Sequence, residues 1–267
     1  MSEQDTFHTE DHDDVTGLVL SGGGARAAYQ VGVLHQLAKW FEQENKREFD
    51  FPFKILCGTS AGAINAAALA CAGRNFYQST ERMLKVWENF SSDQVFRSDS
   101  LGIIRTGARW LSALSIGWML RKRPKCLLDN TPLSHLMHQL LHFRRLDEAL
   151  ENGTIHALAV TASSYSSGRS VTFFQTQKVI ESWARTQRVA LPDRITVEHL
   201  LASAAIPFVF PAVKLNIEGQ MEHFGDGSIR QLAPISPAIH LGANRVMVIG
   251  SSQSDKDHTQ QVEIQNA

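Results

Sequence analysis

The stretch Phe53-Lys54-Ile55-Leu56-Cys57-Gly58-Thr59-Ser60-Ala61-Gly62 decides the fold of this 267-residue chain. Residues 53–57 are mostly apolar and predict a buried strand, whereas the alanine-rich stretch 61–73 predicts a buried helix. Between them, Gly58-x-Ser60-x-Gly62 matches the sharp strand-to-helix turn that exposes a nucleophilic serine hydroxyl. The two glycines remove side chains that would collide there. Ser60 is therefore a candidate nucleophile, and a structural serine in a glycine-rich turn is the alternative.

A second glycine cluster lies near the N-terminus. Residues 16–20 predict a short buried strand, and Ser21-Gly22-Gly23-Gly24-Ala25-Arg26 follows it directly. A helix is expected from about 27 to 44, because apolar residues recur at helical spacing. Backbone N–H groups of such a loop can face an anion, including the oxyanion of an acyl-transfer intermediate.

Dinucleotide binding is the rival interpretation of this loop. Gly22-x-Gly24-x-x-Ala27 also satisfies the dinucleotide fingerprint, which expects an acidic residue about 20 positions later at the end of a second strand. Glu42, Glu44 and Glu48 occur there instead in the polar end of the predicted helix. The dinucleotide interpretation is therefore disfavoured.

A third cluster, Gly225-Asp226-Gly227-Ser228, ends a stretch at 220–224 that alternates loosely like a strand. An aspartate between glycines usually marks a plain turn, so alone it is a weak candidate for a catalytic base. His223 is the competing candidate, because serine hydrolases commonly use histidine. Residues three apart on a strand point to opposite faces, so His223 should not reach Ser60 if Asp226 does.

Taken together, these segments resemble the patatin-like phospholipases. The similar segments are 21–34, 57–66, 202–213 and Asp226-Gly227; they occur in the family's order and span about residues 16 to 250. The chain departs from the usual motifs at Ala27, where glycine is usual, and at Ser228, where glycine or alanine is usual. Both replacements are small and affect the fit of the two turns more than the chemistry.

The resemblance implies a lipid acyl hydrolase that cleaves carboxylic esters, with Ser60 as nucleophile and Asp226 as base. It also implies an oxyanion hole lined by Gly22, Gly23 and Gly24, with Arg26 as the basic residue beside it. No cofactor is expected. Two alternatives stay open: an acyltransferase on a related scaffold, and a non-catalytic lipid- or dinucleotide-binding protein.

The remaining pattern predicts an α/β fold with a mostly parallel central sheet flanked by helices on both faces, a three-layer α/β/α arrangement. Helices are predicted at 76–90, 132–143 and 196–204, and strands at 155–161, 170–176, 213–217 and 245–250. His135, His138 and His142 have helical spacing within 132–143. A solvated helix face is favoured over metal ligation there, because no cysteine or carboxylate stands at ligand spacing.

Composition and charge indicate which partners and which cellular compartment to expect. The net charge of −1 gives no field that would attract nucleic acid. Cys57, Cys71 and Cys126 are odd in number, and two lie in apolar segments, which favours reduced thiols. The sequence shows neither a signal peptide nor an apolar run of the roughly 18 residues that span a bilayer. We therefore expect a cytoplasmic enzyme that meets lipid from the water side.

The expected domain organisation is an acidic disordered tail at 1–14, one domain at 15–250 and a polar tail at 251–267, interpreted as the possible start of a truncated region. Segment 101–123 places Trp110 and Trp118 beside basic residues on an apolar stretch. A cap packed over the sheet is favoured there over a lid that makes peripheral membrane contact, although tryptophan beside basic residues is also typical of interfacial helices.

Overall fold

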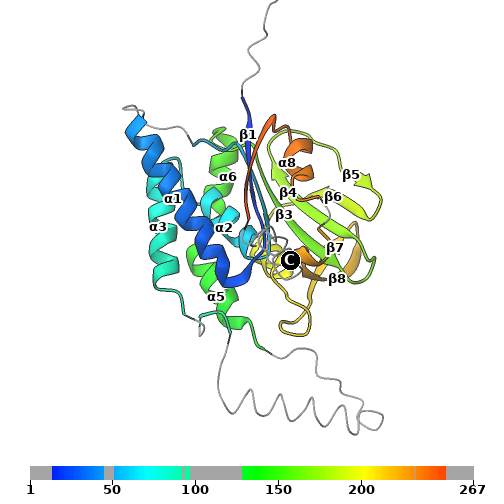
Figure 1. Ribbon diagram of the computed structural model, residues 1–267. Coiled ribbons are helices and arrows are strands. Elements are labelled where there is room, and N and C mark those ends of the chain that lie inside the picture. The colour runs from blue at the N-terminus through cyan, green and yellow to red at the C-terminus, as the bar shows by residue number, and fades with distance from the viewer. Residues whose placement is uncertain (1–13, 45–50, 92–93, 97–127, 232, 251–267) are drawn as a thin grey trace, which may run out of the picture.

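The computed structural model describes residues 14–44, 51–91, 94–96, 128–231 and 233–250 (Figure 1). In this part of the chain nine strands form one sheet, in the order β5-β6-β4-β3-β2-β1-β9, with β8 paired to β3 and β7 to β8. The strands are β1 (Thr16–Leu20), β2 (Ile55–Thr59), β3 (Ala157–Ser164), β4 (Ser170–Thr176), β5 (Trp183–Arg185), β6 (Arg188–Pro192), β7 (Val213–Ile217), β8 (Gln220–Asp226) and β9 (Arg245–Ile249).

The described α-helices are α1 (Ala27–Glu44), α2 (Ala61–Ala70), α3 (Phe76–Glu88), α5 (Thr131–Leu140), α6 (Phe143–Glu151), α7 (Val197–Ser203) and α8 (Ser236–His240). Two short 3-10 helices, η1 (Gly24–Arg26) and η3 (Gly227–Ile229), follow β1 and β8. Strands β9, β1, β2 and β3 run parallel, whereas β4 and β8 run antiparallel to β3. The predicted α/β fold, a mostly parallel sheet with helices around it, is confirmed.

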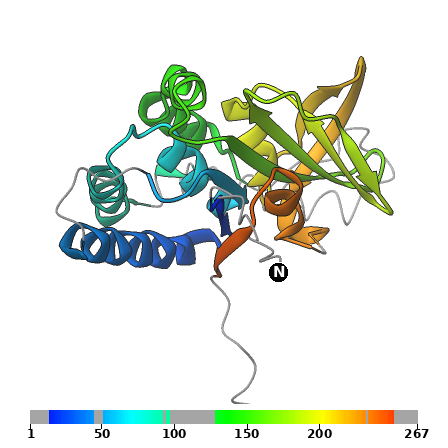
Figure 2. The same cartoon turned by 90° about the horizontal axis from the view of Figure 1, so that it is seen from above.

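The two faces of the sheet are covered very unequally. Successive side chains of a strand point to opposite faces, so Leu56 of β2 packs in the larger core under the long helices while Cys57 packs in a smaller core under α8. Figure 2 shows α1 and α8 on opposite sides of the strands. The small core contains Ala238 and Leu241 from α8 and its end. Within the described residues, one short helix thus covers the second face.

The prediction of a helix at 132–143 is wrong at its C-terminal end. It stops at Leu140, and the chain becomes extended at Leu141, which lies at ψ 110° and is 7% exposed. The new helix α6 begins at Phe143. The break lets both Leu141 and Leu146 reach the core, which one continuous helix would not allow. His135, His138 and His142 are exposed, as expected for a solvated surface.

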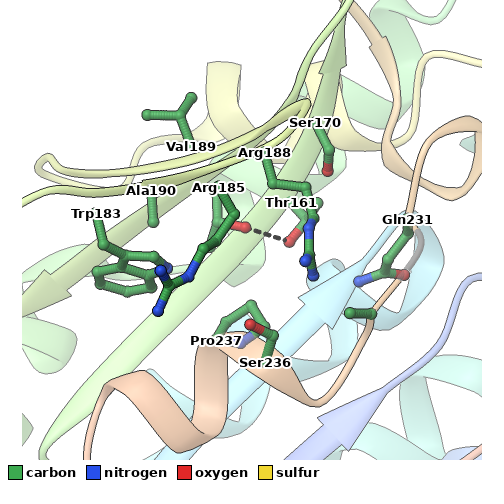
Figure 3. Close-up of a pocket in the computed structure, with 12 residues that line it drawn as sticks. Thr161, Ser170, Trp183, Arg185, Arg188, Val189, Ala190, Gln231, Ser236 and Pro237 are labelled. Atoms are coloured by element: carbon green, nitrogen blue, oxygen red, sulfur yellow. Dashed lines mark hydrogen bonds between the residues drawn. The ribbon is translucent and has the colours of Figure 1, made fainter.

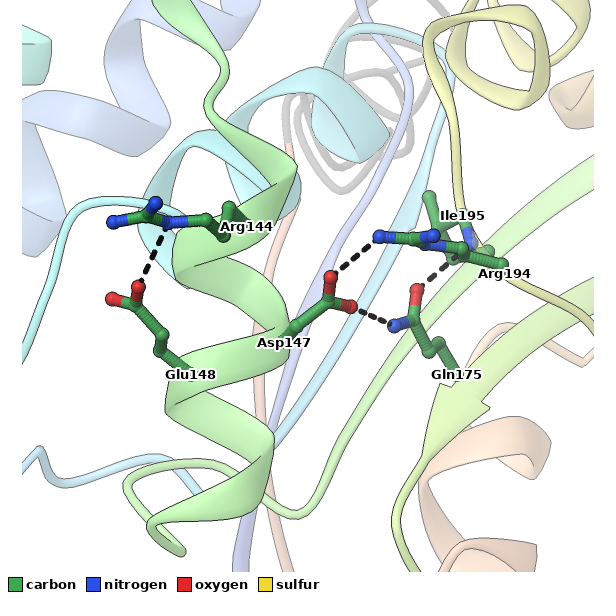
Figure 4. Close-up of polar contacts among 6 residues, drawn as sticks. All are labelled: Arg144, Asp147, Glu148, Gln175, Arg194 and Ile195. Atoms are coloured by element: carbon green, nitrogen blue, oxygen red, sulfur yellow. Dashed lines mark hydrogen bonds and ion pairs between the residues drawn. The ribbon is translucent and has the colours of Figure 1, made fainter.

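Polar side chains of α6 fasten this helix to the sheet (Figure 4). Asp147 accepts hydrogen bonds from Gln175 Nε2 at 2.8 Å and from Arg194 Nη2 at 2.6 Å. Gln175 Oε1 in turn accepts the N–H of Ile195 at 2.9 Å. Helix α6, strand β4 and the approach to α7 are therefore linked by one group of side chains.

Several predictions concern segments outside the described residues, namely the tail at 1–13, segment 101–123, Cys126 and the tail at 251–267. In the described part of the chain, no helix combines the length and apolarity needed to cross a bilayer. Cys57 and Cys71 are free and buried, and burial raises the pKa of each thiol to about 12.

Candidate active site

Ser60 occupies a strained turn between β2 and α2. Its backbone lies at φ 55° and ψ −129°, a left-handed region that costs a non-glycine residue about 1–3 kcal/mol. The turn is possible only with glycines on both sides. A Cβ at Gly58 would overlap the backbone of Gly62 and Ala63, and one at Gly62 would overlap the carbonyl oxygens of Leu20 and Ser21. The turn therefore packs directly against the loop that follows β1.

Ser60 and Asp226 meet at hydrogen-bonding distance. Ser60 Oγ donates to Asp226 Oδ2 at 2.7 Å, and both residues are buried, at 5% and 6% exposure. The second carboxylate oxygen, Oδ1, accepts the N–H of Ser228 at 2.8 Å. The N–H of Asp226 donates to the carbonyl oxygen of Ala205, also at 2.8 Å. The carboxylate is thus fixed on one side and presents its other oxygen to Ser60.

Strand register explains how residues 166 positions apart come together. Strand β2 pairs with β3 as far as Thr59, which lies opposite Thr161. From the next residue of β3, Ala162, strand β8 takes over, and Asp226 lies opposite Ala162. The ends of β2 and β8 are therefore consecutive neighbours along one edge of β3. The parallel and antiparallel pairings of β3 together place the two side chains.

Ser203 is a further residue of the site, and no sequence motif indicates its role. It is fully buried at the end of α7. Its Oγ accepts the N–H of Ser60 at 2.8 Å and donates to the carbonyl oxygen of Thr161 at 2.6 Å. The hydroxyl therefore connects the strained turn to β3. A serine among alanines in a helix carries no sequence signal that would have shown this role.

The glycine loop lies beside Ser60, because β1 and β2 are parallel neighbours and both end at the same edge of the sheet. A Cβ at Gly22 would lie 3.1 Å from Ser60 Cβ and would overlap Ser228 Oγ. Gly24 has φ 56°, which favours glycine. Within the described residues, the N–H groups of Gly23 and Gly24 donate to no protein acceptor.

A buried network of amides supports the loop from below. Gln30 Nε2 donates to the carbonyl oxygens of Ser21 at 2.7 Å and Ile249 at 3.2 Å. Asn65 Nδ2 donates to Gln30 Oε1 at 3.1 Å, and Trp87 Nε1 donates to Asn65 Oδ1 at 3.0 Å. The glycine loop on β1 and the helix that follows Ser60 are therefore joined through fully partnered side chains.

The other predicted residues take the following places. Arg26 is exposed at the end of η1, after the glycine loop. Gly227 follows Asp226, where a Cβ would overlap the carbonyl oxygen of Thr161. His223 is exposed on β8, and its N–H donates to Ser166 Oγ at 3.0 Å, whereas Asp226 on the same strand is buried. The structure thus joins Ser60 to Asp226 and leaves His223 at the surface.

Tyr165 is an unforeseen neighbour of the site. Its hydroxyl lies where a Cβ on Gly225 would be, next to Asp226. Burial raises the pKa of Tyr165, and the negative charge of Asp226 raises that pKa further.

Among the described residues, no group of three histidine, cysteine or acidic side chains is arranged to hold a metal ion.

The molecule is thus an α/β protein with a serine at a strand-to-helix turn, hydrogen-bonded to an aspartate and flanked by a glycine loop. The family model of the patatin-like phospholipases matches residues 18–239, and the chain belongs to this family. This match confirms the resemblance seen in the sequence.

The chain is also similar to solved structures. VipD from Legionella pneumophila is 15% identical with a TM-score of 0.50, and the match covers 94% of this chain and 53% of VipD. Human GIVD cytosolic phospholipase A2 is 15% identical with a TM-score of 0.45, covering 94% of this chain and 42% of that protein. The chain spans about half the length of these proteins. No curated protein sequence matches it significantly.

Proposed function

We propose that the chain hydrolyses carboxylic ester bonds of lipids through a Ser60–Asp226 dyad, with the Gly22–Gly24 loop as oxyanion hole. The observation that carries this proposal is the 2.7 Å hydrogen bond from Ser60 Oγ to Asp226 Oδ2 at the strained turn. Family membership supports the lipid substrate. The exposed position of His223 supports an aspartate rather than a histidine as base.

In the first half-reaction, Ser60 Oγ attacks the ester carbonyl carbon as its proton passes to Asp226. The carbonyl oxygen becomes an oxyanion, which the N–H groups of Gly23 and Gly24 and the N-terminus of α2 would stabilise. The tetrahedral intermediate then collapses. The bond to the alcohol oxygen breaks, the alcohol leaves with the proton held by Asp226, and the acyl group stays on Ser60.

In the second half-reaction a water molecule attacks the acyl carbon and gives its proton to Asp226. The resulting tetrahedral oxyanion occupies the same donors. Its collapse expels Ser60 Oγ, which recovers the proton from Asp226, and a carboxylic acid is released. The N–H of Ser228 on Asp226 Oδ1 keeps the carboxylate oriented during both transfers.

The test compares purified Ser60→Ala, Asp226→Asn and the double variant on a soluble p-nitrophenyl ester. Each single change should lower kcat by about 10³-fold or more, and the double variant should lose little beyond either, because residues acting as one unit give non-additive losses. A fluorophosphonate probe should label the wild type and not Ser60→Ala. His223→Ala is the matched control and should keep nearly full turnover. An inactive His223→Ala beside an active Asp226→Asn would refute the dyad.

A further inference from the structure

A polar pocket opens on the α8 face of the sheet, away from the long helices. It lies between strands β3, β4, β5 and β6 on one side and Gln231 and residues 233–237 on the other (Figure 3). The polar groups that line it include two guanidinium groups, an amide and several hydroxyls, from Arg185, Arg188, Gln231, Ser170, Thr172 and Ser236. No carboxylate is present among the described residues of this lining. The pocket is therefore cationic and rich in hydrogen-bond donors.

The two arginines are held together by strand register. Arg185 and Arg188 lie directly opposite each other on the antiparallel hairpin of β5 and β6, so their side chains leave the same face. Like charges in this position destabilise a hairpin. Within the described residues, neither guanidinium forms an ion pair. Figure 3 shows both side chains directed into the pocket. The arrangement is unfavourable without an anion and favourable with one.

The hairpin is firmly supported. Gln187, in its turn, has φ 60°, and its carbonyl oxygen accepts the N–H of Ser170 at 2.9 Å. Trp183 stacks between Phe174 of β4 and His240 of α8, with ring centroids 4.9 Å apart on both sides. These contacts fix β5 and β6 against both the sheet and α8. The arginine stems therefore leave a rigid base, which reduces the entropy lost when a ligand binds.

We propose that Arg185 and Arg188 form a binding site for a phosphate group. Two guanidinium forks can each donate paired hydrogen bonds to phosphate oxygens, a geometry that ammonium groups do not offer. Gln231, whose amide points into the pocket in Figure 3, and the Ser236 hydroxyl supply further donors. This site goes beyond the proposed hydrolysis, because binding at the arginines requires no turnover at Ser60.

The pocket and the dyad share one residue of β3. The Thr161 side chain lines the pocket, where its Oγ1 lies 2.9 Å from Thr172 Oγ1. The Thr161 carbonyl oxygen accepts the hydrogen bond from Ser203, which holds the N–H of Ser60. A phosphate bound here belongs either to the head group of a lipid substrate or to a free phosphate compound. Both sources present the same oxygen atoms to the arginines.

The binding test titrates inorganic phosphate into the full chain by calorimetry, with chloride holding the ionic strength constant. The double variant R185Q/R188Q should bind phosphate about tenfold or more weakly, since each lost charged hydrogen bond typically costs at least that factor. R188K should show an intermediate loss, because it keeps the charge and lacks the fork. R144Q is the matched control: Arg144 is an exposed arginine paired with Glu148 on α6, and its removal should change nothing.

Thermal unfolding checks that the double variant folds. Phosphate should raise Tm of the wild type and of R144Q but not of R185Q/R188Q, whose Tm without phosphate should not fall, because a like-charge pair has been removed. Three outcomes would overturn the site. They are absence of phosphate binding by the wild type, equal binding by wild type and R185Q/R188Q, and equal binding of phosphate and acetate.

A second arm identifies the source of the phosphate. Hydrolysis of phosphatidylcholine and of diacylglycerol with the same acyl chains is measured in neutral detergent micelles. If R185Q/R188Q loses kcat/KM only on phosphatidylcholine and inorganic phosphate competes, the site holds the head group. If binding is lost but both lipids are affected alike, the site holds a free phosphate compound. Intact phosphate binding without hydrolysis of either lipid would refute the proposed function and leave the site standing.

Discussion

Replacing Ser203 by alanine removes the hydroxyl that holds the strained turn at Ser60. In the native structure this hydroxyl accepts the N–H of Ser60 at 2.8 Å and donates to the carbonyl oxygen of Thr161 at 2.6 Å. Both groups are buried, and an unpartnered buried polar group costs about 1–3 kcal/mol. We therefore expect Ser203→Ala to lower the free energy of unfolding by about 2–4 kcal/mol. For a chain of this size that corresponds to a fall in Tm of about 5–10 °C.

Catalysis should suffer separately from stability. Without Ser203 the strained backbone of Ser60, at φ 55°, loses a contact that holds it, so Oγ shifts relative to Asp226 and the glycine loop. Small misplacements of reacting groups cost up to about 10²-fold, and we expect kcat to fall by about tenfold or more at temperatures where the variant is fully folded.

The assay pairs urea unfolding with p-nitrophenyl ester turnover. The matched control is Ser163→Ala on β3, which also removes a fully buried serine hydroxyl, but one whose contact to the carbonyl oxygen of Gly227 is long, at 3.5 Å. Ser163→Ala should lose about 1 kcal/mol or less and keep its kcat, because a bond of that length contributes little. If Ser203→Ala loses no more stability or turnover than Ser163→Ala, Ser203 does not position the nucleophile.

Further predictions concern other contacts of the site and core. Gly62→Ala should unfold the site or abolish turnover, because the added Cβ would overlap the carbonyl oxygens of Leu20 and Ser21. Its control is Gly32→Ala: Gly32 is exposed on α1 with open space around it, so this change should stabilise the fold by up to about 1 kcal/mol, as measured by urea unfolding. Burial lowers the pKa of His199 from 6.5 despite Asp193 nearby, so protons bind the unfolded chain more readily and the free energy of unfolding should fall as pH drops below about 6.5. His199→Asn should weaken the pH dependence of the free energy of unfolding, and an unchanged pH dependence in this variant would show that His199 is not its cause. Cys57 should react with a thiol reagent at neutral pH only after unfolding, since burial raises its pKa to about 12. Turnover of a soluble ester should survive EDTA, and a loss reversed by Ca²⁺ or Zn²⁺ would show that the dyad is incomplete.

The parts of the site with strong local signatures could be read from the sequence. The turn at Ser60 could be predicted because a strand, a Gly-x-Ser-x-Gly motif and a buried helix follow one another. The structure shows the close backbone contacts that require those glycines. Asp226 has no such signature of its own. Asp226 could be predicted as a site residue only from the order of all the motifs together, because strand β3, against which it pairs, lies about 60 residues earlier in the chain.

Other features could not be predicted, for physical reasons. Strands β5 and β6 are short, and their turn at Thr186-Gln187 lacks the glycine or asparagine that marks a tight hairpin. The break at Leu141 depends on a core that one continuous helix could not reach from both sides. Ser203 and Gln30 act through tertiary hydrogen bonds that leave no local pattern. Sequence periodicity reports which face is buried and not which distant atom a polar side chain meets.

In the proposed mechanism, the order in which the chain is synthesised determines when hydrolysis can begin. Ribosomal synthesis delivers Ser60 with β2 long before Asp226, and the carboxylate reaches Ser60 only when β8 docks on the edge of β3. A nascent chain that has formed β1, β2 and β3 therefore carries Ser60 without its proposed base. Contacts between residues so distant in sequence form late, because closing a long loop costs entropy before the contacts it allows can contribute favourable energy. Recovery of ester turnover during refolding should accordingly follow the slowest folding phase.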